Sequence, residues 1–412
     1  MAELPVLPVW CTEVDLAPGR EPLGAAPTTA ATSRVLVRLD GNPLGYVTAP
    51  AHPGPDDAAL LAALPAGARD RVRARRAGTP AKDALADVPT DVKVSVVVCT
   101  RNRPEVLARC LEHLGRLVYP DLELLVVDNA PADDATRDVV AAAAARDPRL
   151  RYARQDVPGL SHARNRGLEL ATGDVVAYTD DDVRVDPWWV HGLVRGFARR
   201  PDVACVTGLA VAAALDTEVE AYFDARVSWS TVRAPRVFDR ATGRAENPMH
   251  PYAAGVFGTG ANVAFRRADL LRRGGFDVLL GAGTATRGGE DLDAFVQTLV
   301  HGGALAVEPS AVVWHHHRST AAELADQMYG YGTGLTAFYA KLLLDPVTRP
   351  GVLRAVPAGL VRLAGTVAGV RGRNRATAHE SASGPVPGLL RRELTGMLAG
   401  PALYLRARSA RA

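Results

Sequence analysis

The sequence predicts an α/β fold with a mixed, mainly parallel sheet flanked by helices, and two observations carry that prediction. From residue 92 to about 320, short apolar segments alternate with helical segments, which is the pattern of βαβ units. Hydrophobic residues make up 48% of the 412 residues and charged residues 23%, so a disordered or fibrous class is excluded. A small N-terminal region of unknown role, 1–90, and a helical, basic extension, 321–412, complete the predicted organisation.

The N-terminal region carries little recognisable pattern. Residues 34–39 and 44–47 are β-like and flank the turn-forming segment 40–43, which predicts a hairpin. The Ala- and Arg-rich stretch 57–76 predicts a helix. No chemistry is visible in this region.

The elements of the α/β part follow one another at short spacing. The run VSVVV at 94–98 is apolar almost throughout, as in a buried parallel strand, and Pro104 suits the first turn of the helix after it. The predicted strands are 94–98, 122–127, 150–153, 174–178 and 311–314, and the predicted helices are 104–117, 133–145, 161–171 and 187–197.

Polar residues stand directly after three of these strands. Thr100 and Arg101 follow the first, Asp128 follows the second, and Asp180–Asp182 follow the strand at 174–178. Ligands of such sheets bind beyond the carboxyl ends of the strands, so these residues predict a nucleotide site.

The triple aspartate is the most specific of these features. Adjacent carboxylates raise each other's pKa unless a cation neutralises them. Mg²⁺ and Mn²⁺ prefer oxygen ligands and commonly bind one or two carboxylates together with substrate phosphates. The alternative is a solvated acidic turn before the helix at 187–197. The position after an apolar strand favours a divalent metal site.

Cysteine usage and the absence of targeting segments indicate the compartment. The four cysteines form no C-x-x-C pair, which predicts neither a zinc site, a redox motif nor a disulfide framework. No basic segment followed by an apolar run opens the chain, and no run of about 18 apolar residues occurs, so neither a signal peptide nor a spanning helix is expected. We therefore expect a cytoplasmic protein, at most peripheral at the inner face of the cell membrane.

The C-terminal extension is strongly basic. From Lys341 to the end there are twelve Lys or Arg against three Asp or Glu, while the whole chain carries a net charge of only +3. This indicates an anionic partner, either a membrane surface or nucleic acid, although no nucleic-acid recognition module is visible.

Helices are predicted in the extension at 321–343, 352–370 and 389–405, with a polar, flexible segment at 371–385. Glycines at 330, 332 and 334 predict a break in the first helix. Basic amphipathic helices either lie in a membrane interface or pack onto the rest of the protein, and the sequence does not choose between the two.

Eight motifs occur in one order along residues 92–320. They are VSVVVCTRN (94–102), LELLVVDNA (122–130), GLSHARNRGLELATGD (159–174), VVAYTDDDV (175–183), GTGANVAF (258–265), GGFD (274–277), GED (289–291) and WHHHR (314–318). The ordered set resembles glycosyltransferase family 2, whose catalytic domain has the GT-A fold. The resemblance implies an inverting transferase that moves a sugar from a nucleotide-diphosphate sugar to an acceptor hydroxyl.

The resemblance also implies roles on the donor side. Thr100 lines the nucleotide pocket, and Asp128 accepts a hydrogen bond from the base. Arg164 lies near the nucleotide or its phosphates. Asp180 faces the donor sugar or ribose, and Asp182 binds the Mn²⁺ or Mg²⁺ that bridges the diphosphate. Arg101 and Asp181, at the same strand ends, are also expected to bind the donor.

On the acceptor side, Asp291 resembles the general base, with its neighbour Glu290 as the second choice. A carboxylate within hydrogen-bond reach suits an acceptor hydroxyl that must lose a proton. The alternative for this pair is an acidic helix start. A histidine of 315–317 resembles a third metal ligand, with His315 favoured as the first residue after the strand; the alternative is an exposed His-rich turn. Trp188 and Trp189 are predicted to be packing residues.

Departures from the family pattern narrow the prediction. Asn129 stands where a second acid often follows Asp128, and no Q-x-x-R-W motif of processive synthases follows the GED segment, which favours a single-sugar transferase. The acceptor is a glycan, a lipid-linked molecule or a small molecule. The alternatives are an inactive nucleotide-sugar-binding or scaffolding protein and a nucleotidyltransferase, although residues 99–102 lack the glycines of a phosphate loop.

Overall fold

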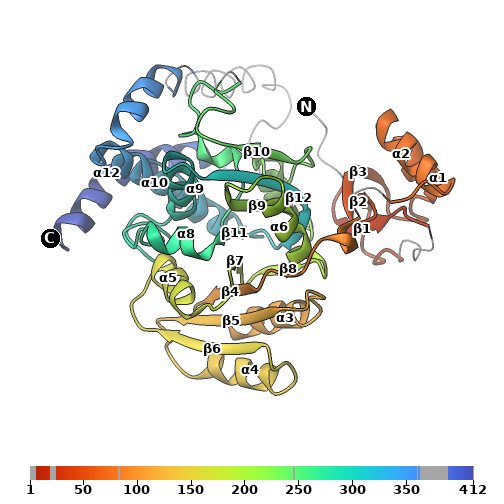
Figure 1. Cartoon of the computed structure of the whole chain (residues 1–412), viewed down its shortest axis with the longest axis horizontal. Coiled ribbons are helices and arrows are strands. Elements are labelled where there is room, and N and C mark those ends of the chain that lie inside the picture. The colour runs from red at the N-terminus through yellow and green to blue at the C-terminus, as the bar shows by residue number, and fades with distance from the viewer. Residues whose placement is uncertain are drawn as a thin grey trace.

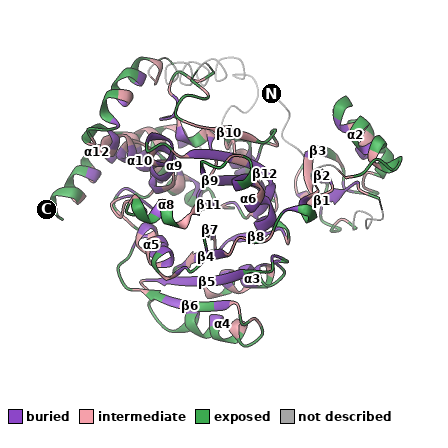
Figure 2. Cartoon of the chain, in the orientation of Figure 1, coloured by how far each residue is buried: buried purple, intermediate pink, exposed green. Residues whose placement is uncertain are grey.

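The computed structural model describes residues 6–18, 25–81, 84–244, 246–359, 361 and 388–411. A large sheet occupies the middle of the molecule, a small sheet lies to one side, and the C-terminal helices lie on the other side (Figure 1). Strands of the large sheet are mostly buried, whereas the helices expose their outer faces (Figure 2). This is a layered α/β fold, as the sequence predicts.

The small sheet belongs to the N-terminal region. It consists of β1 (Val9–Asp15), β2 (Thr32–Leu39) and β3 (Asn42–Pro50). β2 and β3 pair antiparallel across a turn at Asp40 and Gly41, both with positive φ, which confirms the predicted hairpin. β1, which the sequence did not predict, adds to the sheet by pairing parallel to β2.

Two short helices cover one face of this sheet where one helix was predicted. α1 (Asp57–Ala63) and α2 (Ala66–Arg76) are separated at Leu64 and Pro65. A proline lacks the backbone N–H that a continuous helix needs, so the first helix ends before it and the second begins after it. Their apolar side chains and those of the sheet form one cluster, which includes Val35, Val37, Leu60 and Val72.

The large sheet is mixed. Its strand order is β10-β12-β9-β11-β7-β4-β5-β6, and β8 pairs with β12. The strands are β4 (Val94–Thr100), β5 (Leu122–Asn129), β6 (Leu150–Gln155), β7 (Val175–Asp180), β8 (Val183–Val185), β9 (Val203–Ala212), β10 (Arg236–Phe238), β11 (Asn262–Arg266) and β12 (Ala304–His315).

Strand directions divide this sheet into two parts. β7, β4, β5 and β6 run parallel to one another, as do β9 and β12, whereas β11 runs antiparallel between β7 and β9. The predicted strands at 94–98, 122–127, 150–153 and 174–178 are confirmed as β4 to β7, and 311–314 is the end of β12. Strands β8 to β11 were not predicted.

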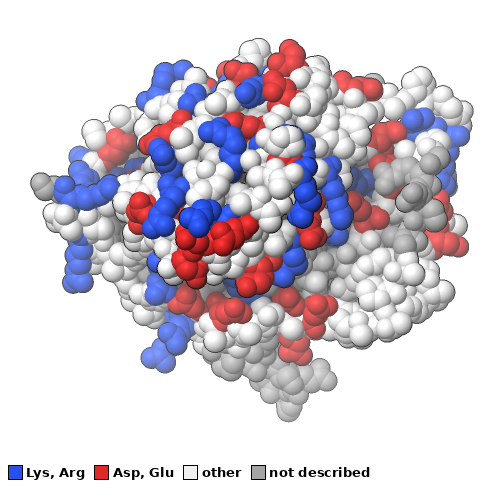
Figure 3. Space-filling model, turned by 90° about the horizontal axis from the view of Figure 1, so that it is seen from below, with Lys and Arg blue, Asp and Glu red and all other residues white. Residues whose placement is uncertain are grey.

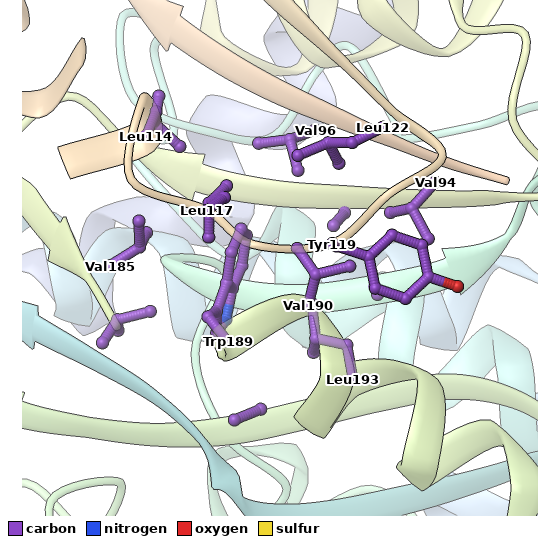
Figure 4. Close-up of a cluster of buried hydrophobic side chains, with 14 of the residues drawn as sticks. Val94, Val96, Leu114, Leu117, Tyr119, Leu122, Val185, Trp189, Val190 and Leu193 are labelled. Atoms are coloured by element: carbon purple, nitrogen blue, oxygen red, sulfur yellow. The ribbon is translucent and has the colours of Figure 1, made fainter. Parts of the chain in front are cut away.

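Helices lie on both faces of the large sheet. They are α3 (Pro104–Leu114), α4 (Ala135–Ala144), α5 (Leu160–Leu170), α6 (Trp189–Ala198), α8 (Arg267–Arg272) and α9 (Glu290–Val300). The apolar side chains of α7 (Glu218–Arg226) belong to a separate cluster. Successive side chains of β4 pack on opposite faces of the sheet. Val96 packs in one apolar cluster with α3 and α6, and Val97 packs in another with α5 and α9. Trp189 lies in the first cluster beside Val190 and Leu117, which confirms it as a packing residue (Figure 4).

The C-terminal extension is helical in its described parts. α10 (Ala321–Leu344) is followed by a helical segment at 349–359 and by α12 (Leu389–Ser409). The helix predicted at 352–370 lies only partly within the described residues, and the segment 371–385 lies outside them. Within the described part of the chain, each helix falls short of the length and apolarity needed to cross a bilayer.

The glycines of α10 do not break it, contrary to the prediction. A Cβ on Gly332 would lie 2.1 Å from the carbonyl oxygen of Glu393 in α12, and one on Gly334 would lie 2.6 Å from the backbone of Gly288. These residues let neighbouring backbones approach closely. That packing outweighs the cost of about 1 kcal/mol per glycine in a helix.

Candidate active site

The three predicted strand ends meet at one edge of the large sheet. Thr100 at the end of β4 pairs in register with Asp128 of β5, and Cys99 pairs with Asp180 of β7. The strands are parallel, so their carboxyl ends open on the same side. The residues predicted to form the nucleotide site therefore lie close together in the structure.

A metal-type cluster lies at this edge. Asp180, Asp182 and His315 each offer a ligand atom, and these atoms all lie within 4.8 Å of one another. His315 is the last residue of β12 and pairs with Val183 of β8, which brings its Nε2 to 3.7 Å from Asp182 Oδ1. Of the three consecutive histidines, His315 is the one in the cluster.

The protonation of this cluster suits a divalent cation. Burial lowers the pKa of His315 to about 4, so its imidazole is neutral and has a free lone pair at neutral pH. Burial would raise the pKa of Asp182, but nearby positive charges lower it overall; because His315 is neutral, Arg103 and Arg318 are the cations that act there at pH 7. Two carboxylates and one imidazole are a donor set that Mn²⁺ or Mg²⁺ accepts.

Asp181 points away from this cluster. Its carboxylate accepts a hydrogen bond of 2.7 Å from the Thr100 hydroxyl and one of 2.6 Å from Arg103. Arg103 also reaches Asp182 at 3.2 Å, so one guanidinium spans two of the three aspartates. Thr100 and Asp181, both predicted to bind the donor, are hydrogen-bonded to each other.

Arg164 joins the metal-type cluster to the second acidic motif. Its side chain is 3% exposed and donates hydrogen bonds to Glu290 at 2.9 Å and to the Gly260 carbonyl at 3.2 Å. It also lies 3.6 Å from Asp180. A Cβ on Gly260 would lie 2.7 Å from this guanidinium, so a larger residue there would displace it.

The two residues of the ED pair differ in environment. Glu290 is buried against Arg164, and burial together with the charge of Asp291 raises the pKa of Glu290 to about 7. Asp291, in the first turn of α9, is only half-buried and accepts a hydrogen bond of 2.9 Å from the backbone N–H of Gly260. Asp291 is thus the carboxylate of the pair that a substrate can reach.

Asp128 carries an unsatisfied acceptor. Its Oδ2 accepts a hydrogen bond of 3.0 Å from the Tyr152 hydroxyl, while Oδ1 is buried without a partner in the described structure. Burial raises the pKa of this carboxyl group. A buried acceptor without a partner is uncommon and indicates a missing donor.

Two other residues at the strand ends have different roles. Asn129, in the place of a second acid, accepts a hydrogen bond from the Gly159 N–H at 2.8 Å and donates one to the Val157 carbonyl at 2.8 Å, so it fixes the loop before α5. Arg101 is exposed, and its guanidinium lies beside Gly283. Arg101 is therefore free to meet a ligand.

Sequence reasoning missed Arg103, Arg318 and Tyr152. The acidic triplet signals that cations must be near, but the chain contains many arginines and local pattern does not say which of them fold onto the site. Asn262, from the GTGANVAF motif, is a packing residue. It lies fully buried at the start of β11, where its side chain accepts a hydrogen bond from the Trp189 indole N–H and donates to two backbone carbonyls.

Residues 95–269 match the family described as Glycosyl transferase family 2. A glucosyl-dolichyl phosphate glucuronosyltransferase of Haloferax volcanii is 30% identical over 198 residues, covering 46% of this chain and 58% of that protein. The succinoglycan biosynthesis protein ExoM of Rhizobium meliloti is 31% identical over 252 residues, covering 58% of this chain and 72% of ExoM. A pre-mycofactocin glycosyltransferase of Mycobacterium tuberculosis is 28% identical over 244 residues, covering 59% of this chain and 47% of that protein. The chain thus spans about half the length of two of these relatives and more of the third.

A solved structure shares the fold. The mannosyltransferase from Pyrobaculum calidifontis in complex with GDP-Man and Mn²⁺ aligns with a TM-score of 0.51 at 20% sequence identity, over 81% of this chain and 92% of that chain. A likeness at this identity shows that the large sheet and its helices form a GT-A fold, and function has to be argued from the site itself.

Proposed function

The chain belongs to glycosyl transferase family 2, and we propose that it transfers a sugar from a nucleotide-diphosphate sugar to an acceptor hydroxyl with inversion at the anomeric carbon. The observation that carries the proposal is that Arg164, at one edge of the sheet, contacts both Asp180 of the cluster Asp180, Asp182 and His315 and Glu290, the neighbour of Asp291. The division into an N-terminal region to residue 90, a catalytic domain at 92–320 and a C-terminal extension is part of the same proposal.

On the donor side, three features support nucleotide binding. The unpaired Asp128 Oδ1 suits a hydrogen bond from a base N–H, and Arg101 is free to meet phosphate. Asp180, Asp182 and His315 would hold Mn²⁺ or Mg²⁺, which would offset the negative charge that builds on the leaving diphosphate. Thr100 and Asp181 contribute indirectly, because their hydrogen bond fixes the floor of the site.

On the acceptor side, Asp291 acts as the general base. The acceptor oxygen attacks the anomeric carbon while the bond from that carbon to the diphosphate breaks, and the hydroxyl proton passes to the Asp291 carboxylate. The Gly260 N–H orients that carboxylate at 2.9 Å. Glu290 is unsuited to this role because it is buried and paired with Arg164.

Arg164 holds both halves of the site in register. Its buried guanidinium is engaged by Glu290, Asp180 and the Gly260 carbonyl, so it fixes the acids that face the donor and the acceptor. The family resemblance implies that Arg164 lies near the nucleotide or its phosphates, and we assign it this positioning role there.

The described part of the C-terminal extension supports contact with an anionic membrane surface. The end of α10 and the segment after it expose apolar side chains, among them Val347 at 55% and Leu353 at 56%, and α12 exposes Leu398 at 84%. Arginines such as Arg354 and Arg406 share these elements. Acidic and basic side chains are interspersed on the face seen in Figure 3. The basic excess of the extension is a feature of its sequence, with twelve Lys or Arg against three Asp or Glu from Lys341 onward. A cytoplasmic enzyme docked in this way at the inner face of the membrane would be near a lipid-linked acceptor.

Flotation with vesicles tests the membrane contact. The full chain is expected to float with phosphatidylglycerol vesicles at low salt and to dissociate at high salt, because the attraction is electrostatic. Truncation after residue 345 is expected to abolish flotation. Equal binding to neutral vesicles, or binding that survives the truncation, would contradict the membrane proposal without touching the catalytic one.

A thermal-shift screen tests the donor site. Nucleoside diphosphates and their sugars, with GDP-mannose and UDP-glucuronate first, are added with and without Mn²⁺ to the wild type and to Asp182→Asn. A ligand that binds only the folded state raises the unfolding midpoint. We expect a Mn²⁺-dependent shift with one nucleotide that the variant loses. No shift with any nucleotide would favour the inactive scaffolding alternative.

A further inference from the structure

His317 is a buried histidine that the proposed mechanism does not use. Its side chain is fully enclosed, and its ring lies edge-on to Phe223 of α7. Both of its ring nitrogens face a polar partner: Nδ1 lies 3.1 Å from Nδ1 of His315, and Nε2 lies 3.5 Å from Oδ1 of Asp224. The metal-type cluster is therefore continued inward by a second histidine and a carboxylate.

One assignment of protons satisfies the contacts that link Asp182, His315, His317 and Asp224. The Nε2 of His315 faces Asp182, so it must keep its lone pair to bind a cation, and its proton then sits on Nδ1. That N–H donates to Nδ1 of His317, which places the proton of His317 on Nε2, where it faces the Asp224 carboxylate. A hydrogen bond to the outer ring nitrogen is what sets the tautomer of a metal-binding histidine.

Asp224 is held in turn by the N-terminal region. Its other oxygen, Oδ2, accepts a hydrogen bond from the Arg34 guanidinium of β2, and this pair is an ion pair between the small sheet and α7. Arg34 also lies over the ring of Tyr46, 4.3 Å from its centre. Asp224 is 8% exposed, so the cation of Arg34 is what makes a carboxylate tolerable at this buried position.

We propose that Asp224 and Arg34 are positioning residues for the metal ligand His315, and that the N-terminal region serves the active site through the row Arg34–Asp224–His317–His315. This rests on the proposed function, because it takes the cluster of Asp180, Asp182 and His315 to be a metal site. It gives residues 1–90, in which the sequence shows no chemistry, a defined contribution: they fix which nitrogen of His315 is free to bind the cation.

Asp224→Asn is the most specific perturbation because it reverses the direction of the hydrogen bonds from residue 224 through His317 to His315. The Asn oxygen stays with Arg34, so its NH₂ group faces Nε2 of His317 and donates to it. The proton of His317 then moves to Nδ1, where it donates to Nδ1 of His315, and the proton of His315 moves to Nε2. The nitrogen that should bind the cation is thereby blocked, although the shape of the site is unchanged.

The measurement is the affinity for Mn²⁺ alone, from the electron paramagnetic resonance signal of free Mn²⁺. Loss of an outer partner of a metal ligand weakens binding on the order of 10- to 100-fold, and we expect that loss in Asp224→Asn. The matched control is Asp186→Asn. It removes a second buried ion pair between the small sheet and the catalytic part, in which Arg38 lies 2.5 Å from Asp186. The control is expected to bind Mn²⁺ as the wild type does.

A second variant covers the case in which Asp224→Asn fails to fold. A hollow of about 370 Å³ lies against Arg34, lined also by Tyr46, Asp224 and Thr231, so Arg34→Ala leaves room for a free guanidinium ion. Arg34→Ala is expected to bind Mn²⁺ more weakly, and low millimolar guanidinium is expected to restore the affinity, while the wild type does not respond. Loss without rescue would show that packing, and not the ion pair, matters.

Asp182→Asn separates this inference from the proposed function. If Asp182→Asn abolishes Mn²⁺ binding while Asp224→Asn and Arg34→Ala leave it intact, the metal site stands and the positioning role is wrong. An equal loss in Asp186→Asn would likewise overturn it, because loosening of the whole interface would then be the cause. If Asp182→Asn has no effect, the metal site itself is wrong and the inference falls with it.

Discussion

Replacing Arg164 by methionine tests the charge pairing at the centre of the site. The Arg164 side chain is 3% exposed and that of Glu290 is 8% exposed, and the two are hydrogen-bonded at 2.9 Å. Methionine keeps much of the apolar contact of the arginine stem but removes the cation, which leaves a buried carboxylate unpaired. Removing one partner of a buried ion pair costs about 3–5 kcal/mol, so we expect a loss of unfolding free energy of that size above about pH 8.

The loss depends on pH because Glu290 can take up a proton. Burial, and then the charge of Asp291, raise the pKa of Glu290 to about 7 in the folded protein, above its ordinary value of 4.5. A raised pKa means that protonation favours the folded state, so the stability present below about pH 4.5 is lost as the pH rises through 7. Arg164 lowers this pKa, and without it the protonated form persists to higher pH. The deficit of Arg164→Met should therefore shrink toward about pH 5.

The free energy of unfolding is measured by urea titration, with circular dichroism as the probe, at acid and alkaline pH. The proteins compared are the wild type, Arg164→Met, Glu290→Gln and the double variant. The double variant removes both charges and should recover at least half of the loss, because no unpaired carboxylate remains there. A loss below about 1 kcal/mol at both pH values, or no recovery in the double variant, would refute the reasoning, since neither fits an interaction worth several kcal/mol.

Three further predictions concern the donor pocket and the C-terminal helices. Asp128→Asn should leave stability unchanged, because its Oδ1 has no partner, yet weaken binding of the identified nucleotide about 10- to 100-fold in titration calorimetry, the worth of a hydrogen bond to a charged group. Lys341→Met should cost about 3–5 kcal/mol in urea unfolding, because Asp293 is buried and pairs with that lysine. Gly396→Leu should release α12 and expose it to limited proteolysis, because a Cβ there would lie 2.3 Å from a carbonyl of α10, whereas Leu398→Ala, at 84% exposure, should change nothing.

The sequence predicts well those elements whose signal is local. β4 and β5 are mainly apolar runs that end in polar residues. A parallel sheet brings those ends together by geometry alone, so the position of Asp128 beside Thr100 follows from the pattern. The first part of the sheet and the acids at its edge were accordingly predicted. β9 is also apolar, but its alanines and its glycine are weak strand formers, and it was missed.

What sequence reasoning could not supply depends on contacts between distant residues. Nothing near Arg34 indicates that it pairs with Asp224, 190 positions later. The glycines of α10 read as helix breakers because their partners, Gly288 and the backbone of α12, are known only once the helices are packed. The same holds for Arg103, whose place between two aspartates is set by the fold of the loop before α3.

Release of nucleoside diphosphate from the identified donor, in the presence of acceptor, tests the central claim most directly. The wild type is expected to require Mn²⁺ or Mg²⁺, and Asp182→Asn is expected to be inactive. Asp291→Asn is expected to lower kcat about 10²- to 10⁴-fold, the usual contribution of a general base, while its Mn²⁺-dependent thermal shift with the donor stays that of the wild type. Full activity in Asp291→Asn, or transfer by the wild type that is unaffected when the metal is chelated, would contradict the account.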